Sequence, residues 1–192
     1  EKGRVWDGEV LHLAVHLFVE NLLIREMEEL LSFAPSAAIA KYKGKITLKS
    51  NDIKNFLLKL YRLFQREKFN LIFSEKTLTS FKLGLIGTPD IIARNIDGEV
   101  IPIDIKLGRL SKRGVKKEHV IQAVGEALLV GDFLRRDVKK AYLIYFQSNS
   151  VAKLTITKEM KKEFMRLKKK LERALSKPII PERSKIPNAK IK

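Results

Sequence analysis

Apolar residues near the start of the chain recur at the spacing of an amphipathic helix. The predicted helix begins at Asp7, whose side chain would cap it, and ends before Pro35, because proline disrupts a helix interior. Its core-facing residues are Leu11, Val15, Phe18 and Leu22. A short strand over residues 45–48 and a second helix from Ser50 or Asn51 are expected to follow. The apolar side of this second helix comprises Ile53, Phe56, Leu57, Leu60, Leu63 and Phe64.

From residue 71 onward the pattern predicts strands, over residues 71–79, 81–94 and 99–106. Asn95-Ile96-Asp97-Gly98 separates the last two, and its glycine suits the left-handed position of a hairpin turn. A helix, two strands and a final helix capped by Thr157 are then expected, over residues 119–133, 140–147, 151–156 and 158–175. Residues 177–192 show no periodicity and are expected to form an extended tail or linker. The chain is therefore expected to hold one α+β domain over residues 1–176, with helices flanking a mixed sheet.

The charge of the chain points to a polyanionic partner. Lys and Arg total 39 against 22 Asp and Glu, a net charge of +17. Such an excess attracts phosphate groups, and a lysine-rich solvated surface, as in thermophilic proteins, is the alternative explanation. The chain has no cysteine, which excludes disulfides, thiolate zinc sites and an iron–sulfur cluster held by this chain alone. No apolar run is long enough to span a bilayer and no secretory leader opens the chain, so we expect a cytoplasmic location without membrane contact.

Two acidic residues are predicted to meet across the hairpin. A three-residue loop would pair Asn95 with Glu99, and counting outward pairs Asp90 with Asp104 on one face, with Cβ atoms about 5 Å apart. Lys106 lies on the same face as Asp104, while the opposite face, Ile101, Ile103, Ile105 and Leu107, is expected to be core. Two bare carboxylates this close repel by about 3–4 kcal/mol at an effective dielectric constant of roughly 20. A shared proton, Lys106 or a divalent cation would offset this repulsion, and the plain alternative is a solvated strand face.

Four short motifs occur between Gly8 and Leu129. They are Gly8-Glu-Val-Leu-His12, Gly87-Thr-Pro-Asp90, Asp104-Ile-Lys106 and the helix around Gln122. In this order they resemble the PD-(D/E)xK nucleases of the RecB-like branch, most of all the CRISPR-associated RecB-like exonuclease family, which works in spacer acquisition. The resemblance implies a restriction-endonuclease-like fold and DNA hydrolysis that depends on Mg²⁺ or Mn²⁺. It implies His12, Asp90, Asp104 and the backbone carbonyl of Ile105 as metal ligands, and Asp90, Asp104, Lys106 and Gln122 as catalytic residues.

Two features depart from that family. The branch usually has a tyrosine four residues after its helical glutamine, where this chain has Glu126, so the role of the tyrosine is not carried over. The CRISPR family usually binds an iron–sulfur cluster on four cysteines, and this chain has none. A piece of a longer, cluster-bearing protein and a cluster-free relative both fit the sequence.

Several other residues are candidates for supporting roles. His12 and His16 lie one helical turn apart, but only His12 matches a motif, so His16 is not expected to bind metal. Glu75 and His119 are expected at the surface, with a place behind the metal ligands as the alternative for Glu75. The loop after the catalytic strand is basic and is expected either to guide the DNA backbone or to be a solvated charge run. Its basic residues are Arg109, Lys112, Arg113, Lys116 and Lys117.

Three functions are compatible with these patterns. We expect a metal-dependent exonuclease acting on single-stranded DNA ends, with the CRISPR integrase complex as a partner. One alternative is a catalytically idle, nuclease-like subunit that binds DNA, against which the intact Asp90, Asp104 and Lys106 argue. The other is a structure-specific endonuclease on the same core, against which His12 and the Gln122 helix argue, because both are typical of the RecB-like branch.

Overall fold

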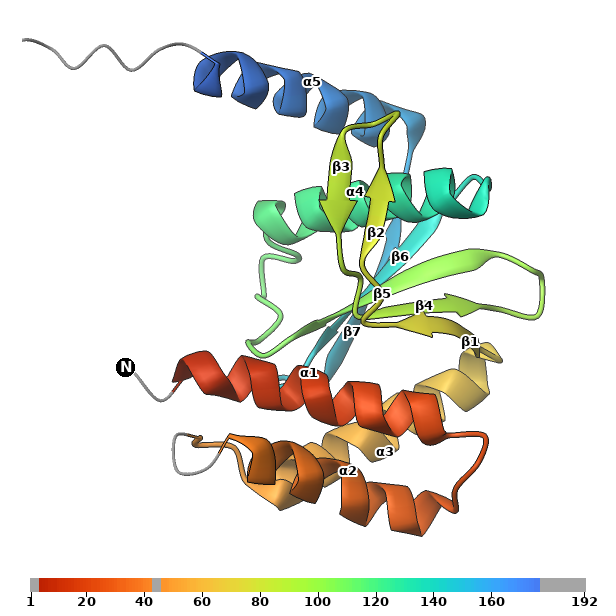
Figure 1. The fold of residues 1–192 in the computed structure, drawn as a ribbon, viewed down its shortest axis with the longest axis vertical. Coiled ribbons are helices and arrows are strands. Elements are labelled where there is room, and N and C mark those ends of the chain that lie inside the picture. The colour runs from red at the N-terminus through yellow and green to blue at the C-terminus, as the bar shows by residue number, and fades with distance from the viewer. Residues whose placement is uncertain (1–3, 43–45, 177–192) are drawn as a thin grey trace, which may run out of the picture.

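Five helices and a five-stranded mixed sheet make up residues 4–42 and 46–176, the part of the chain that the computed structural model describes (Figure 1). The helices are α1 (Arg4–Asn21), α2 (Met27–Lys41), α3 (Ser50–Glu67), α4 (Lys117–Leu134) and α5 (Lys158–Leu175). The sheet has the order β1-β4-β5-β6-β7, comprising Asn70–Ser74, Ile91–Arg94, Val100–Lys106, Lys140–Tyr145 and Ser150–Thr155. Strands β5 and β6 are parallel and the other neighbours are antiparallel, which confirms the predicted α+β fold with a mixed sheet.

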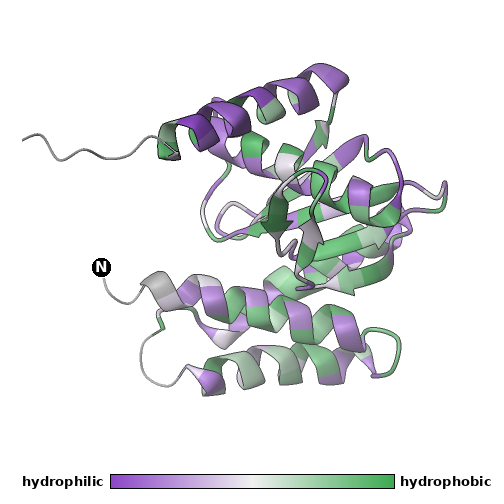
Figure 2. Cartoon of the chain, turned by 45° about the horizontal axis from the view of Figure 1, so that its top comes forward, coloured by the Kyte–Doolittle hydropathy of each residue, from purple (hydrophilic) through white to green (hydrophobic). Residues whose placement is uncertain are grey.

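Two apolar cores sandwich this sheet. One lies between the sheet and helices α1, α2 and α3, and the other lies between the opposite face and helix α4 (Figure 1). Helix α1 packs against α2, α3 and β1, so it carries buried residues on more than one side. Figure 2 shows the same division, with apolar residues along the sheet and a largely hydrophilic α5 at its edge. Within the described residues, no helix is long and apolar enough to cross a membrane.

Two of the predicted helices agree closely with the structure. All six apolar residues assigned to the core-facing side of α3 are buried. Helix α5 begins where Thr157 was expected to cap it, and the Thr157 hydroxyl accepts a hydrogen bond from the backbone N–H of Met160 at 3.3 Å. Local signals were sufficient in both cases, because each helix carries a regular apolar stripe or a side-chain cap.

The prediction for the first 48 residues was wrong in three respects. The expected single helix is two, α1 and α2, separated by a turn, and Pro35 is buried inside α2 rather than ending a helix. Asp7 lies within α1, where its carboxylate accepts hydrogen bonds from the backbone and side chain of Thr47 instead of capping the helix. Residues 46–48 form no strand, and residue 45 lies outside the described residues, as do residues 177–192 of the expected tail.

The strand region is more broken than the sequence predicted. The two long strands expected over residues 71–94 are four short ones, because β2 (Leu78–Ser80) and β3 (Leu85–Gly87) leave the main sheet and pair with each other. This β2–β3 hairpin packs against α4. The face of β5 that carries Asp104 is also buried rather than solvated, since Val100 and Pro102 lie beneath α4.

The predicted hairpin between β4 and β5 is confirmed with its register. Gly98 has a left-handed backbone (φ +77°), and the Asn95 N–H donates to the Glu99 carbonyl at 3.1 Å. The ladder pairs Arg94 with Val100 and continues to Ile91 opposite Ile103. One further step places Asp90 opposite Asp104, as the turn length requires.

Candidate active site

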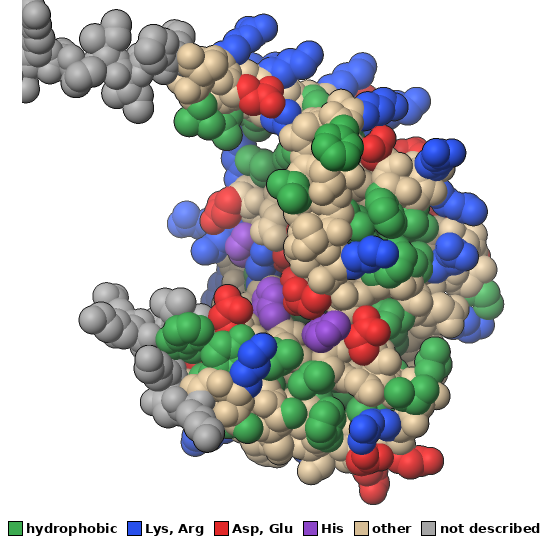
Figure 3. All heavy atoms as spheres, in the orientation of Figure 1, with side chains coloured by type: hydrophobic (Ala, Val, Ile, Leu, Met, Phe, Trp, Pro, Cys, Tyr) green, Lys and Arg blue, Asp and Glu red, His purple; other side chains and the backbone are tan. Residues whose placement is uncertain are grey.

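Polar side chains from four parts of the fold converge where β4 begins and β5 ends. Asp90 precedes β4, Asp104 and Lys106 belong to β5, His12 comes from α1, and Gln122 comes from α4. Asp90 and Asp104 are 7% and 3% exposed, which is rare for aspartate unless its charge is compensated. Figure 3 shows the histidines and several acidic side chains gathered between the α1–α3 layer and the upper half of the molecule.

The first half of the site is a cluster of His12, Glu75 and Asp90. The His12 Nδ1 atom lies 3.1 Å from Asp90 Oδ1 and 3.6 Å from Glu75 Oε1, and one ligand atom from each residue fits within 4.8 Å of the others. The second Asp90 oxygen accepts a hydrogen bond from the backbone N–H of Ile105, which fixes the carboxylate against β5. These contacts leave three potential metal-ligating groups facing one point.

Glu75 owes its position to the pairing of β1 with β4. Its backbone N–H donates to the Asp90 carbonyl at 3.0 Å, one step beyond the end of the ladder. Its backbone is left-handed, with φ +50°, a conformation that costs a non-glycine residue about 1–2 kcal/mol. The surrounding structure therefore holds Glu75 in a disfavoured conformation beside Asp90, as is common at functional sites.

The second half of the site is a hydrogen-bonded network around Asp104. The Lys106 Nζ atom lies 3.0 Å from Asp104 Oδ1 and donates to Gln122 Oε1 at 2.6 Å. The Gln122 amide donates to Asp104 at 2.7 Å and to Glu126 at 2.9 Å. Asp104 Oδ2 is buried and has no hydrogen-bond partner among the described residues. Lys106 Nζ lies 2.8 Å from it and forms an ion pair with it, but the geometry is not that of a hydrogen bond.

The electrostatics of the site show an excess of negative charge. Burial and the neighbouring Asp90 raise the pKa of Asp104 to about 6, against the opposing effect of Lys106. Burial and Asp104 raise the pKa of Glu126 to about 8. Burial alone would lower the pKa of His12, but hydrogen bonds to Asp90 and Glu75 raise it to about 10, so a proton bridges these carboxylates. The raised carboxyl pKa values follow first from burial and then from the neighbouring carboxyl groups, and Lys106 only partly opposes them.

These residues fit a divalent cation. Carboxylate oxygens and an imidazole nitrogen suit Mn²⁺, and carboxylate oxygens with water suit Mg²⁺. The His12 Nδ1 atom faces both Glu75 and Asp90, and the buried Asp104 carboxylate is near enough to Asp90 and His12 for their charges to shift its pKa. A cation there would neutralise charge that Lys106 and His12 only partly balance.

The structure brings most of the predicted site residues together. His12 meets Asp90, and Asp104, Lys106 and Gln122 form one network. Ile105 lies between them in sequence with its side chain in the α1–α3 core, and its carbonyl as a metal ligand stays a prediction. His16 does not join the cluster, because its Nδ1 lies 3.0 Å from the Ser74 hydroxyl.

All five predicted basic residues are exposed: Arg109, Lys112, Arg113 and Lys116 lie between β5 and α4, and Lys117 is the first residue of α4. Among the described residues the only ion pair that they make is a 4.0 Å contact between Lys116 and Glu118. Their charges are therefore directed mainly to solvent, on the segment that links β5 to α4. Contact with DNA stays a prediction for all five.

Sequence reasoning placed two residues of the site wrongly or not at all. Glu75 was expected at the surface, with a place behind the metal ligands as the alternative, but it lies partly exposed beside His12, and no local pattern marks this position because the pairing of β1 with β4 creates it. Glu126 was noted only as a departure from a family pattern, but it lies one turn after Gln122 and faces the same network. Helical spacing from Gln122 was the signal that would have included Glu126.

Comparison with known proteins gives little further information about the chain. No protein-family model matches it, and no curated protein matches it either. Among solved structures, it is similar to SSO0001, with 17% identity, a TM-score of 0.41, and coverage of 86% of this chain and 74% of that one. It is also similar to a "putative exonuclease" from Eubacterium rectale, with 12% identity, a TM-score of 0.47, and coverage of 84% and 66%. Both likenesses are too distant to carry an argument about activity, which rests on the geometry of the site.

Proposed function

We propose that this protein is a metal-dependent deoxyribonuclease that hydrolyses phosphodiester bonds. The observation that carries the proposal is the convergence of His12, Glu75 and Asp90 beside the buried pair Asp104–Lys106. Three carboxylates, Glu75, Asp90 and Asp104, and the carboxyl group of Glu126 share the site with two cationic groups among the described residues, His12 and Lys106. A site of this charge repels the scissile phosphate unless a cation binds first, so a bound metal would be required for cleavage, whereas binding of the strand can rest on basic side chains outside this point.

His12, Glu75 and Asp90 would hold Mg²⁺ or Mn²⁺, with Asp104 and the Ile105 carbonyl completing the set. When bound, the ion lowers the pKa of coordinated water and offsets the negative charge that develops on the phosphate. Lys106 is held by Asp104 and Gln122, with its side chain only 17% exposed, so its ammonium group is already oriented. It would stabilise the same developing charge, or orient the attacking water, without a reorganisation step.

The choice of substrate and setting rests on the sequence. The RecB-like motifs support exonuclease action on single-stranded DNA ends, and the likeness to the CRISPR-associated family supports a role in spacer acquisition with the integrase complex in the cytoplasm. The net charge of +17 and the exposed basic loop support DNA as the partner. If a longer parent protein carries an iron–sulfur cluster, its ligands lie outside this cysteine-free chain.

The test is cleavage of end-labelled single-stranded and double-stranded DNA, with a covalently closed circle as a third substrate. Each is incubated with Mg²⁺, Mn²⁺ or a chelator. We expect stepwise shortening of single strands that have ends, only with metal, and an intact circle.

Each other outcome has a distinct meaning. Cleavage of the circle would favour the endonuclease alternative on the same core. Binding of all substrates without cleavage in either metal would favour the DNA-binding subunit. Undiminished cleavage in the chelator would contradict the metal site.

A further inference from the structure

His119 extends the candidate site along α4 with an uncharged side chain. It lies in the first turn of that helix, and His119, Gln122 and Glu126 share one face because they are three and four residues apart. Gln122 and Glu126 already contact the Asp104 network. His119 therefore continues the row outward, about 4.5 Å along the helix axis from Gln122. The basic loop ends directly before this turn, with Lys116 as its last residue outside α4.

A buried tyrosine holds the ring of His119. The Tyr145 hydroxyl lies 2.9 Å from His119 Nδ1, and the two rings have centroids 5.7 Å apart. Tyr145 is 1% exposed and pairs with Lys106 on the neighbouring strand, so the tyrosine is a rigid support beside the catalytic lysine. Among the described residues, His119 Nε2 makes no hydrogen bond. One ring nitrogen is thus engaged by the protein, and the other is available to a ligand.

The charges around His119 favour an anionic ligand. Burial and the positive Lys106 lower the pKa of His119, so its imidazole is neutral at neutral pH. Burial raises the pKa of Tyr145, which keeps its hydroxyl protonated and able to donate. With the hydroxyl donating to Nδ1, the single ring proton lies on Nε2 and makes that atom a donor. Lys106 and Lys116 add positive potential around the donor, against the opposing charges of Glu118 and, on the Tyr145 side, Asp104.

We infer that His119 binds a backbone phosphate of the substrate next to the scissile one, through Nε2, and that Tyr145 fixes the ring for this contact. The inference rests on the proposed nuclease function, since Lys106 and Gln122 define where the scissile phosphate lies. The step of about 4.5 Å along the helix axis from Gln122 to His119 places His119 beside, rather than at, the position of the scissile phosphate. The contact would set the register of the strand in the site rather than take part in bond cleavage.

Two conservative substitutions of His119 distinguish the roles of its two ring nitrogens. In His119→Gln the amide nitrogen replaces Nε2 and keeps a donor for phosphate, whereas in His119→Asn the shorter amide ends near the position of Nδ1, where its oxygen can accept from Tyr145 but no donor reaches the phosphate. We expect His119→Asn to weaken binding of a fluorescent oligothymidylate by about tenfold, the usual effect of losing a hydrogen bond to a charged group. His119→Gln should stay within about twofold of the parent protein.

Methylphosphonate substitution identifies the contact. Each linkage of the oligothymidylate is neutralised in turn, and binding is measured in a chelating buffer so that no cleavage occurs. The parent protein should lose affinity most at one linkage, and His119→Asn should lose that selective penalty at the same linkage. Tyr145→Phe should reduce the penalty, while Tyr142→Phe, the matched change on the same strand, should keep it.

The result that overturns the inference is an identical linkage profile in the parent protein and in folded His119→Asn, as judged by circular dichroism. Failure of the nuclease proposal would look different. Absence of cleavage with a preserved linkage-specific penalty would leave His119 as a phosphate contact of a DNA-holding protein. Metal-dependent cleavage with a flat profile would remove only the role of His119.

Discussion

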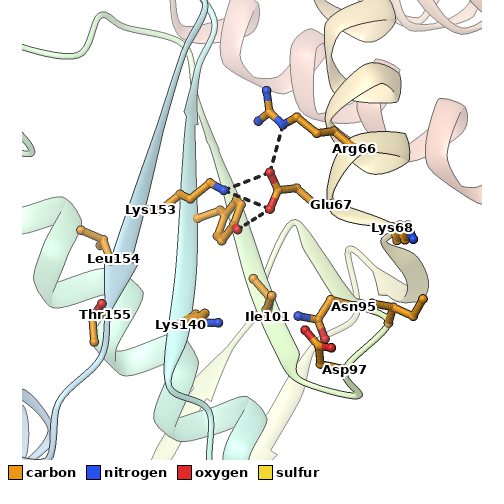
Figure 4. Close-up of a pocket in the computed structure, with 12 residues that line it drawn as sticks. Arg66, Glu67, Lys68, Asn95, Asp97, Ile101, Lys140, Lys153, Leu154 and Thr155 are labelled. Atoms are coloured by element: carbon orange, nitrogen blue, oxygen red, sulfur yellow. Dashed lines mark hydrogen bonds and ion pairs between the residues drawn. The ribbon is translucent and has the colours of Figure 1, made fainter.

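Two polar clusters lie at opposite ends of the β4–β5 hairpin, and they are built from similar residues with opposite electrostatics. Near the turn, Glu67 accepts hydrogen bonds from Tyr142, Lys153 and Arg66, at 2.9–3.0 Å (Figure 4). Burial alone would raise the pKa of Glu67, but these donors lower it below its ordinary value. One carboxylate is thus surrounded by enough donors, and the cluster is complete without a ligand.

The cluster at the other end of the hairpin is incomplete. There the pKa values of Asp104 and Glu126 are raised, and a buried Asp104 oxygen lacks a hydrogen-bond partner among the described residues. Negative charge exceeds positive charge, and the deficit is localised where His12, Glu75 and Asp90 converge. The comparison teaches that the direction of the carboxyl pKa shifts, rather than the number of charged residues, distinguishes a cluster with uncompensated buried carboxyl groups from a structural ion-pair cluster.

The largest expected difference is in cleavage. Asp104→Asn should reduce the turnover rate on the order of a thousandfold, because it removes a charge that the metal requires and presents amide hydrogens to a cation. Binding to DNA should be preserved, since it is spread over many Lys and Arg side chains. The measurement is a paired cleavage and binding assay, with Glu67→Gln as the matched loss of a carboxylate. Parental turnover by folded Asp104→Asn would place the nuclease site elsewhere.

The next largest difference between the two clusters should be in how a lost carboxylate affects metal affinity. Glu75→Gln should weaken Mn²⁺ binding by about 10-fold or more, because it removes one of three converging charges. Titration calorimetry measures the affinity, and the rise in melting temperature on adding Mn²⁺ provides a second readout. Glu67→Gln should lower the melting temperature but keep the parental Mn²⁺ affinity. Equal affinities for the parent and Glu75→Gln would remove Glu75 from the metal site.

The two clusters should also respond differently to pH. The pKa of His12 is raised from 6.5 to about 10, so its protonated form adds stability below pH 6.5 that is lost as pH rises toward 10. The protonated form of Glu126, whose pKa is raised from 4.5 to about 8, also adds stability that is lost as pH rises between these two values. Glu67, whose pKa is lowered, adds stability that is lost only as pH falls through its own range. The unfolding free energy of metal-free protein should therefore decline between pH 6.5 and 10.

Denaturant unfolding measured at several pH values tests this decline. His12→Gln should make it shallower, and saturating Mn²⁺ should do the same in the parent protein, because the metal replaces the proton on His12. Glu67→Gln should keep the parental slope above pH 6.5. A parental slope in His12→Gln would show that other groups cause the decline.

The smallest expected effect concerns the basic loop. Three single variants are made, in which Arg109, Lys112 or Arg113 is replaced by alanine. Each should reduce the magnitude of the log–log salt slope for binding to single-stranded DNA by about 0.7. Fluorescence anisotropy at several salt concentrations measures the slope. Alanine at the exposed Lys54, Lys59 and Arg62 of α3 removes the same charge away from the site and should change it less. Equal effects of both sets would show that net charge, not the loop, guides the DNA.

Local patterns in the sequence determined the hairpin and the residues that it places. Asn95 to Gly98 fix the turn, the turn fixes the register of β4 and β5, and the register brings Asp90 opposite Asp104 with Lys106 adjacent. This chain of inference needs no distant contact, because side chains alternate along a strand and the loop length sets the pairing. The apolar stripe of α3 and the Thr157 cap were predictable for the same reason.

Only the tertiary structure decided which residues join that pair. Glu75 reaches the site because β1 pairs with β4, and His119 meets Tyr145 because α4 packs across the parallel strands β5 and β6. The interior position of Pro35 in α2 and the burial of Asp104 beneath α4 are likewise consequences of packing. Such contacts join residues far apart in the chain, and burial rather than local propensity determines them, so the sequence showed the pairing of Asp90 with Asp104 but not the full charge of the site around it.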